Sequence, residues 1–172
     1  GIGAYGMLTR DGGFRADSGF DEAKLNLLAD ANLAGGTLRM RASGTVLNQE
    51  TAGFVQGFRA YADPVLRRSN PNPESYRDAW SGRLSAQWTR DEPCAGCSDA
   101  VRLIARRSGM EFMQHFLIGE PIERNGQRSI AVVASSARRP LASLGVQAGI
   151  DGELSDSSLL EYQPWATTGG TA

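Results

Sequence analysis

The sequence has few of the residues that build metal centres or helical membrane spans. Histidine occurs once, at His115, and cysteine twice, at Cys94 and Cys97. A lone CxxC cannot supply four zinc ligands, and His115 lies far along the chain, so we expect no metal site. Apolar runs stay well short of the roughly 18 residues that a membrane helix needs. These shortages exclude a structural zinc domain and a helical membrane protein.

Charge and motif content favour neither nucleic-acid binding nor catalysis. The formal net charge is −1, and the arginines are spread along the chain, so we expect no nucleic-acid partner. No nucleophile motif such as GxSxG occurs. The stretch "GIGAYG" (1–6) is glycine-spaced, but no helix is expected after it to present N–H groups to a phosphate. We therefore expect no enzyme and no cofactor.

The dominant pattern in the chain is alternation of apolar and polar residues. In "GGTLRMRASGTVLNQETAGF" (35–54), Leu38 and Met40 fall on one parity, and Arg39 and Arg41 on the other. A period of two is typical of a β-strand with two different faces. Further alternating segments lie at 23–33, 79–89, 100–109, 128–137 and 144–154, with a less regular one near 2–9. The pattern predicts about seven strands.

The connections between these segments alternate in length. Short joins at 34–36 and 137–143 and an intermediate one at 90–99 separate longer ones at roughly 49–78 and 109–128. This predicts an all-β fold, an antiparallel up-and-down meander with long loops at one rim and short turns at the other. Cys94 and Cys97 fall in the intermediate connection at 90–99, where they form either a local disulfide or two free thiols.

The two faces of the predicted sheet differ in composition. We expect Leu38, Met40, Trp80, Leu84, Val146 and Ile150 on a convex face, and Arg39, Arg41, Arg83, Gln147 and Asp151 on the concave face. Trp88 follows Trp80 by eight positions, which at about 3.3 Å per residue approaches the roughly 25 Å apolar band of a transmembrane barrel. A soluble β-sandwich also has strands with one wet face, so alternation alone leaves both folds open.

Four segments carry a resemblance to a known family. They are "LNQETAGFVQGFRAYAD" (47–63), "NPNPESYRDAW" (70–80), "MEFMQHFLIGEPIERNGQRSIAV" (110–132) and "LLEYQP" (159–164). Together they resemble the barrel region of TonB-dependent outer-membrane receptors, which import scarce nutrients such as ferric siderophores. The resemblance runs from about residue 11 onward.

The resemblance implies a fold, a location and partners. Residues 1–172 are then a partial receptor barrel domain, an incomplete portion of a large transmembrane β-barrel in the cell outer membrane. No plug domain is expected in it, and strands are missing from it, because a bacterial barrel needs an even number of strands and at least eight. The implied partners are outer-membrane lipid, an extracellular small-molecule ligand such as a metal chelate, and TonB through the absent N-terminal region. A soluble β-sandwich that binds a ligand is the alternative.

Two groups of residues are candidates for the functional site. The polar parity carries Arg39, Arg41, Arg83, Arg102 and Arg106, which either form an electropositive lumen wall or pair across strands with Asp30, Asp151 and Glu153. The outer loops offer Phe58, Arg59, Tyr61, Tyr76, Arg77 and His115, which either contact ligand or pack the loops.

Overall fold

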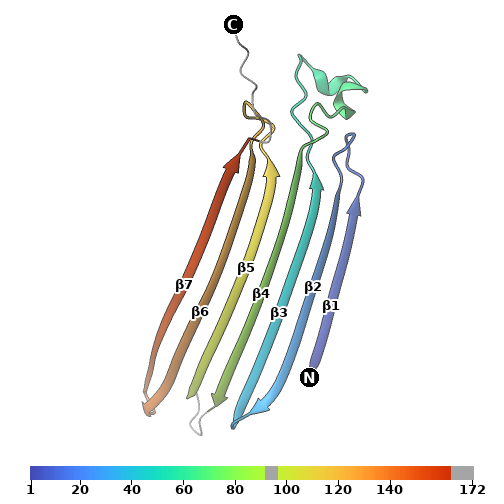
Figure 1. Cartoon of the computed structure of the whole chain (residues 1–172). Helices are drawn as coiled ribbons and strands as arrows, with labels where there is room; N and C mark the ends of the chain where they lie inside the picture. The colour runs from blue at the N-terminus through green and yellow to red at the C-terminus, as the bar shows by residue number, and fades with distance from the viewer. Residues whose placement is uncertain (92–96, 164–172) are drawn as a thin grey trace.

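A computed structural model describes residues 1–91 and 97–163 as one antiparallel sheet in the strand order β1-β2-β3-β4-β5-β6-β7 (Figure 1). The strands are β1 (Ile2–Asp11), β2 (Phe20–Leu33), β3 (Gly36–Glu50), β4 (Tyr76–Asp91), β5 (Ser98–Met113), β6 (Ile122–Leu141) and β7 (Leu144–Tyr162). Each strand pairs with the next in sequence, and β1 and β7 form the two edges of a sheet that does not close. The predicted all-β meander of seven strands is confirmed.

Alternation of apolar and polar residues favours one register for each pair of strands. The β2–β3 ladder runs without interruption from Phe20 opposite Gln49 to Leu33 opposite Gly36. The β6–β7 ladder has the one register shift among the described pairs, between Arg138 and Leu141. Pro140 lies within that shift. Proline has no backbone N–H to donate to a neighbouring strand, so it is tolerated where the ladder is interrupted.

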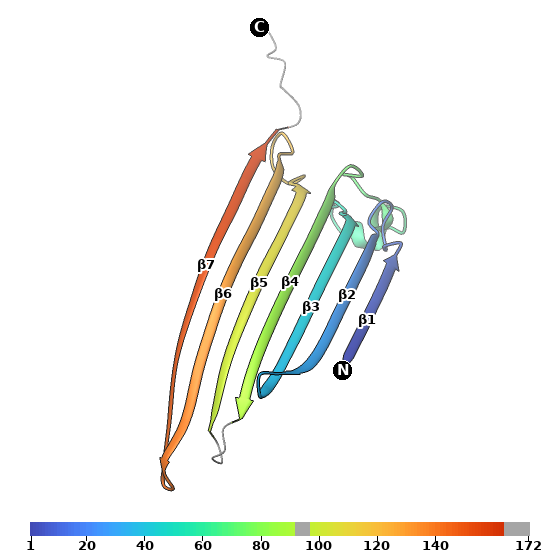
Figure 2. The same ribbon diagram turned by 60° about the horizontal axis from the view of Figure 1, so that its bottom comes forward.

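Connections of different length lie at opposite ends of the sheet (Figures 1 and 2). The loop at 51–75 is the longest and contains two short 3₁₀ helices, η1 (Ala60–Ala62) and η2 (Leu66–Arg68). No helix in the described part of the chain is long and apolar enough to cross a membrane. The predicted separation of long loops from short turns is confirmed.

One predicted loop is much shorter than expected. The join expected at 109–128 is a loop of residues 114–121, because β5 continues to Met113 and β6 begins at Ile122. Gly109 pairs with Gly126 and Glu111 with Arg124, so residues that resemble loop formers extend the ladder beyond the apolar segments.

Much of the apolar face of this sheet is exposed, unlike the apolar face in a soluble two-layer fold. Leu25, Leu84 and Ile150 are 51%, 56% and 74% exposed, whereas the polar residues Glu22 and Lys24 are half-buried. The buried hydrophobic residues of the described chain are Cys97, Ile104, Met113, Ile122 and Ala131. The sheet therefore has no continuous core of its own, and its apolar face is uncovered.

The structure describes one of the two cysteines that were predicted to form either a disulfide or two free thiols. Cys94 lies outside the described residues. Cys97 directly precedes β5, is 4% exposed and is disulfide-bonded.

Asn70 makes the largest set of side-chain hydrogen bonds that hold the 51–75 loop, beside those of Arg15 to Gly53 and Asn72 to Glu120. Asn70 Oδ1 accepts hydrogen bonds from the N–H groups of Gly53 and Asn72, both 3.0 Å, and its Nδ2 donates to the Asp17 carbonyl at 2.7 Å. The loop is thereby tied to its own base and to the β1–β2 loop.

Replacing Asn70 with Ala should release the 51–75 loop without disturbing the sheet. We expect trypsin to cleave after Arg67 or Arg68 several-fold faster in Asn70→Ala, because loop opening no longer breaks three hydrogen bonds. Ser69→Ala is the control, since Ser69 Oγ donates to the Leu66 carbonyl, three residues away in the same loop. Equal cleavage rates in the wild type and Asn70→Ala would contradict the anchoring role.

The turn between β2 and β3 carries a strained residue. Ala34 and Gly35 have φ values of 50° and 73°, which is the pattern of a two-residue type I′ hairpin turn. Alanine is disfavoured at positive φ, whereas asparagine tolerates it.

Ala34→Asn should therefore raise the free energy of unfolding by about 0.5–1 kcal/mol. The reverse control is Gly35→Ala, where a Cβ meets no atom within 4 Å and only backbone strain opposes the substitution. We expect it to destabilise by about 1 kcal/mol. Urea midpoints give both values, and a lower midpoint for Ala34→Asn would rule out this turn geometry.

Candidate functional site

The strand register brings five arginines onto one face of the sheet. We call Arg39, Arg41, Arg83, Arg102 and Arg106 the arginine wall, and we call the face that carries them the polar face. Arg39 lies opposite Gln87, which in turn lies opposite Arg102, and Arg83 lies opposite Arg106. All five side chains are exposed. The predicted common face of these arginines is confirmed.

Some arginines of the arginine wall form cross-strand ion pairs and others do not. Arg39 Nε lies 3.3 Å from Asp30 Oδ1, and Arg106 Nη2 lies 3.3 Å from Glu153 Oε2. Arg102 Nε donates to Gln87 Oε1 at 2.9 Å. Exposed pairs of this kind contribute about 0–1 kcal/mol each. Within residues 1–91 and 97–163, Asp151 makes no ion pair, so the predicted pairing with Asp30 and Glu153 is confirmed and that with Asp151 is wrong.

The opposite face, here called the apolar face, has a tryptophan at each end of its central row. The Arg107 guanidinium stacks on the Trp80 ring at 5.6 Å, and the Arg90 guanidinium stacks on the Trp88 ring at 5.7 Å. Trp80 lies against Gly109, where a Cβ would come within 2.8 Å of the indole nitrogen. Between the two tryptophans, the β4 residues on this face are Gly82, Leu84 and Ala86.

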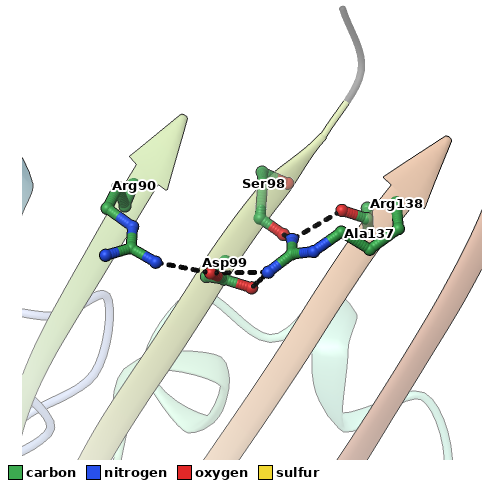
Figure 3. Close-up of polar contacts among 5 residues, drawn as sticks. All are labelled: Arg90, Ser98, Asp99, Ala137 and Arg138. Atoms are coloured by element: carbon green, nitrogen blue, oxygen red, sulfur yellow. Dashed lines mark hydrogen bonds and ion pairs between the residues drawn. The ribbon is translucent and has the colours of Figure 1, made fainter. Parts of the chain in front are cut away.

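An arginine–aspartate–arginine bridge spans three strands beside Trp88. Asp99 of β5 accepts hydrogen bonds from Arg90 of β4 at 3.1 Å and from Arg138 of β6 at 2.9 and 3.0 Å (Figure 3). At the other end of the apolar face, Arg128 pairs with Asp156 at 2.9 Å. Charged groups therefore border the apolar residues at both ends.

The loop candidates do not converge on one site. Phe58, Arg59 and Tyr61 lie together in the 51–75 loop, where Phe58 is 96% and Tyr61 73% exposed. His115 lies in the 114–121 loop, edge-on to Phe116 with ring centroids 5.7 Å apart. These residues are placed in loops as predicted.

Tyr76 and Arg77, by contrast, are strand residues and not loop residues. Tyr76 pairs with Glu50 and Arg77 with Gln49 in the β3–β4 ladder, because alternation continues beyond the turn formers at 70–73. The Arg77 guanidinium lies 6.0 Å from the Phe112 ring centroid, on the neighbouring strand.

Sequence reasoning missed a cluster made of Tyr76, Glu111 and Arg124, which lies beyond Trp80 on the apolar face. Tyr76 donates to Glu111 Oε1 at 2.5 Å, and Arg124 Nε bonds the other carboxylate oxygen. Arg124 and then Tyr76 hold the pKa of Glu111 below its usual 4.5. Burial, followed by the hydrogen bond to Glu111, raises the pKa of Tyr76 above 10. The cluster was hidden because 109–128 was interpreted as a loop.

Two further observations bear on chemistry. Among the described residues, no group of three or more His, Cys, Asp or Glu side chains is arranged to hold a metal ion. Residues 2–6 of the stretch "GIGAYG" (1–6) lie within β1, where Gly3 and Gly6 pair with Leu28 and Leu25. It is therefore not the turn before a helix that binds a dinucleotide phosphate.

Comparison with known proteins gives one partial similarity. No family model matches the chain. It is 37% identical over 84 residues to an acetaldehyde dehydrogenase of Thermus thermophilus, a match that covers 48% of this chain and 27% of that protein. The chain thus spans about a quarter of the length of that relative.

The Glu111 cluster predicts a pH dependence. A carboxyl group whose pKa is lowered in the folded state adds stability above its unfolded pKa, and this stability is lost as the pH falls through the folded pKa. Lowering the pH from 7 to 3.5 should thus reduce the unfolding midpoint more in the wild type than in Glu111→Gln. Glu50→Gln is the control, because no partner of the Glu50 carboxylate is found among the described residues. An identical loss in all three proteins would show that Glu111 is not the linked group.

Proposed function

We propose that this chain is part of the wall of a transmembrane β-barrel in the outer membrane, in a TonB-dependent receptor that takes up a scarce nutrient such as a ferric siderophore. One observation carries the proposal. The apolar face is exposed across all seven strands and is bordered at both ends by tryptophan with stacked arginine. Lipid is the environment that such a face fits.

The dimensions of the apolar face support a membrane-spanning role. Trp80 and Trp88 stand eight positions apart on one strand, or about 26 Å along it at 3.3 Å per residue, which at a barrel tilt of about 35–45° spans about 19–22 Å of a hydrocarbon band of roughly 25 Å. Tryptophan prefers the interface between hydrocarbon and water, because its ring is largely apolar and its N–H needs a partner. Arginine beside it keeps its charge in water while its stem lies over apolar surface.

The two ends of the sheet suggest an orientation. Barrels of this type have short turns on the periplasmic side and longer loops outside. The 51–75 and 114–121 loops would then lie at the cell surface, where Phe58, Tyr61 and His115 could meet the ligand. The arginine wall would line the lumen, with uptake energised by TonB through a plug domain that other parts of the receptor supply.

A soluble β-sandwich is the competing fold, and it requires a second sheet to cover the apolar face. Its apolar face must pack against a second sheet about 10 Å away. Here the seven strands form a single sheet, so a sandwich would need its second layer from elsewhere.

Two neighbouring substitutions test the membrane role. Leu84 lies on the apolar face near the middle of β4, and Ser85 is the next residue, on the polar face. In the full-length receptor, Leu84→Arg should weaken membrane insertion by about 2–4 kcal/mol, because it places a charge near the bilayer midplane. Ser85→Arg adds the same side chain to the polar face and should assemble normally.

Assembly is measured as heat-modifiable gel mobility of outer-membrane fractions. Loss of the folded band in Leu84→Arg alone is the expected result. Two normal bands would sink the membrane proposal, since arginine on a water-exposed face costs little. Loss of the band in Ser85→Arg alone would show that the lipid face has been assigned to the wrong side of the sheet.

A further inference from the structure

The middle of the arginine wall contains four side chains arranged as a square. The β3–β4 register sets Arg41 opposite Ser85 and Ser43 opposite Arg83. The two guanidinium groups thus occupy one diagonal and the two hydroxyls the other. Diagonal neighbours across an antiparallel pair are about 7–8 Å apart, which long side chains can bridge.

None of the four side chains has a hydrogen-bond or ion-pair partner anywhere in the described chain. This separates Arg41 and Arg83 from the other arginines of the wall, since Arg39 is paired with Asp30, Arg102 with Gln87 and Arg106 with Glu153. The square therefore offers two guanidinium forks and two hydroxyls whose hydrogen-bonding capacity no protein group uses.

A hollow of about 530 Å³ lies over the square. Eleven residues line it, among them Arg39, Arg41, Arg83 and Arg102. Four of these residues are arginines and none is acidic, so the hollow is electropositive. It is large enough for a small solute.

We propose that this hollow binds a small multivalent oxyanion, a solute that presents phosphate or carboxylate groups to Arg41 and Arg83. A guanidinium donates two parallel hydrogen bonds to one oxyanion group, which lysine cannot do, and the serine hydroxyls supply further donors. The binding itself is independent of the membrane proposal. The role of the bound anion as cargo rests on it.

Stability does not explain the placement of these arginines. Arg83 lies directly opposite Arg106, and like charges in that position destabilise a sheet. Arg41 gains no ion pair in compensation. A bound anion would relieve the repulsion that the bare face carries.

The test is calorimetric titration of the purified full-length protein with inorganic pyrophosphate at low ionic strength. Arg41→Gln and Arg83→Gln should each weaken binding roughly tenfold. Arg41→Lys keeps the charge but loses the fork and should fall between the wild type and Arg41→Gln. Arg67→Gln, in the 51–75 loop, removes an equal charge far from the square and should bind as the wild type does.

Two results would overturn the site. The first is unchanged affinity in both glutamine variants, and the second is an equal loss in Arg67→Gln, which would indicate only general charge attraction. A hexa-aspartate peptide is titrated in parallel. If it bound through Arg41 and Arg83 while pyrophosphate did not, the square would instead serve an acidic polypeptide segment. Membrane insertion is measured separately, with Leu84→Arg. Either proposal can therefore fail while the other is still tested.

Discussion

The structure depends on one constraint, which is that a single sheet has two faces and this chain covers neither. A domain normally buries the apolar face of a sheet against a second layer. Here the ladder satisfies the backbone from β1 to β7, while the described side chains that become buried are few and scattered. Backbone pairing sets the shape of the sheet, but net stability must come from whatever covers the apolar residues.

The side chains at the borders of the apolar face follow from that constraint. A sheet face that contacts an apolar medium needs a sharp boundary between apolar and charged residues. A charged side chain within the apolar region costs free energy, and an apolar side chain beyond it gains no burial. The Asp99 bridge with Arg90 and Arg138 lies at one edge, and the Arg128–Asp156 pair lies at the other. Trp88 lies two residues from Arg90, and Trp80 lies two residues from Gly82, which is in line with Arg128 across β5. Polar and apolar groups are thus segregated along the strands as well as between the faces.

Strand number, strand order and the facing of side chains could all be predicted from the sequence, because a period of two leaves only two faces and short turns leave only neighbouring strands to pair. The residues at which the strands end could not be predicted. Gly109, Asn125 and Gly126 read as loop formers, yet they extend the ladder because their neighbours Glu111 and Arg124 bond across it. The common face of the wall was predictable from parity. Which of its arginines find partners depends on diagonal contacts that the pattern does not encode.

Arginine rather than lysine carries almost all the positive charge, with Lys24 the single lysine. At the ends of the apolar face this choice has a structural reason, since a guanidinium can stack on indole and bridge two strands to one carboxylate. In the middle of the polar face the same reason does not apply, because Arg41 and Arg83 neither stack on a ring nor pair with an acid among the described residues. Their fork geometry is suited to an oxyanion that the chain itself does not supply. The part of the wall that contributes least to holding the sheet together is therefore the part best suited to binding.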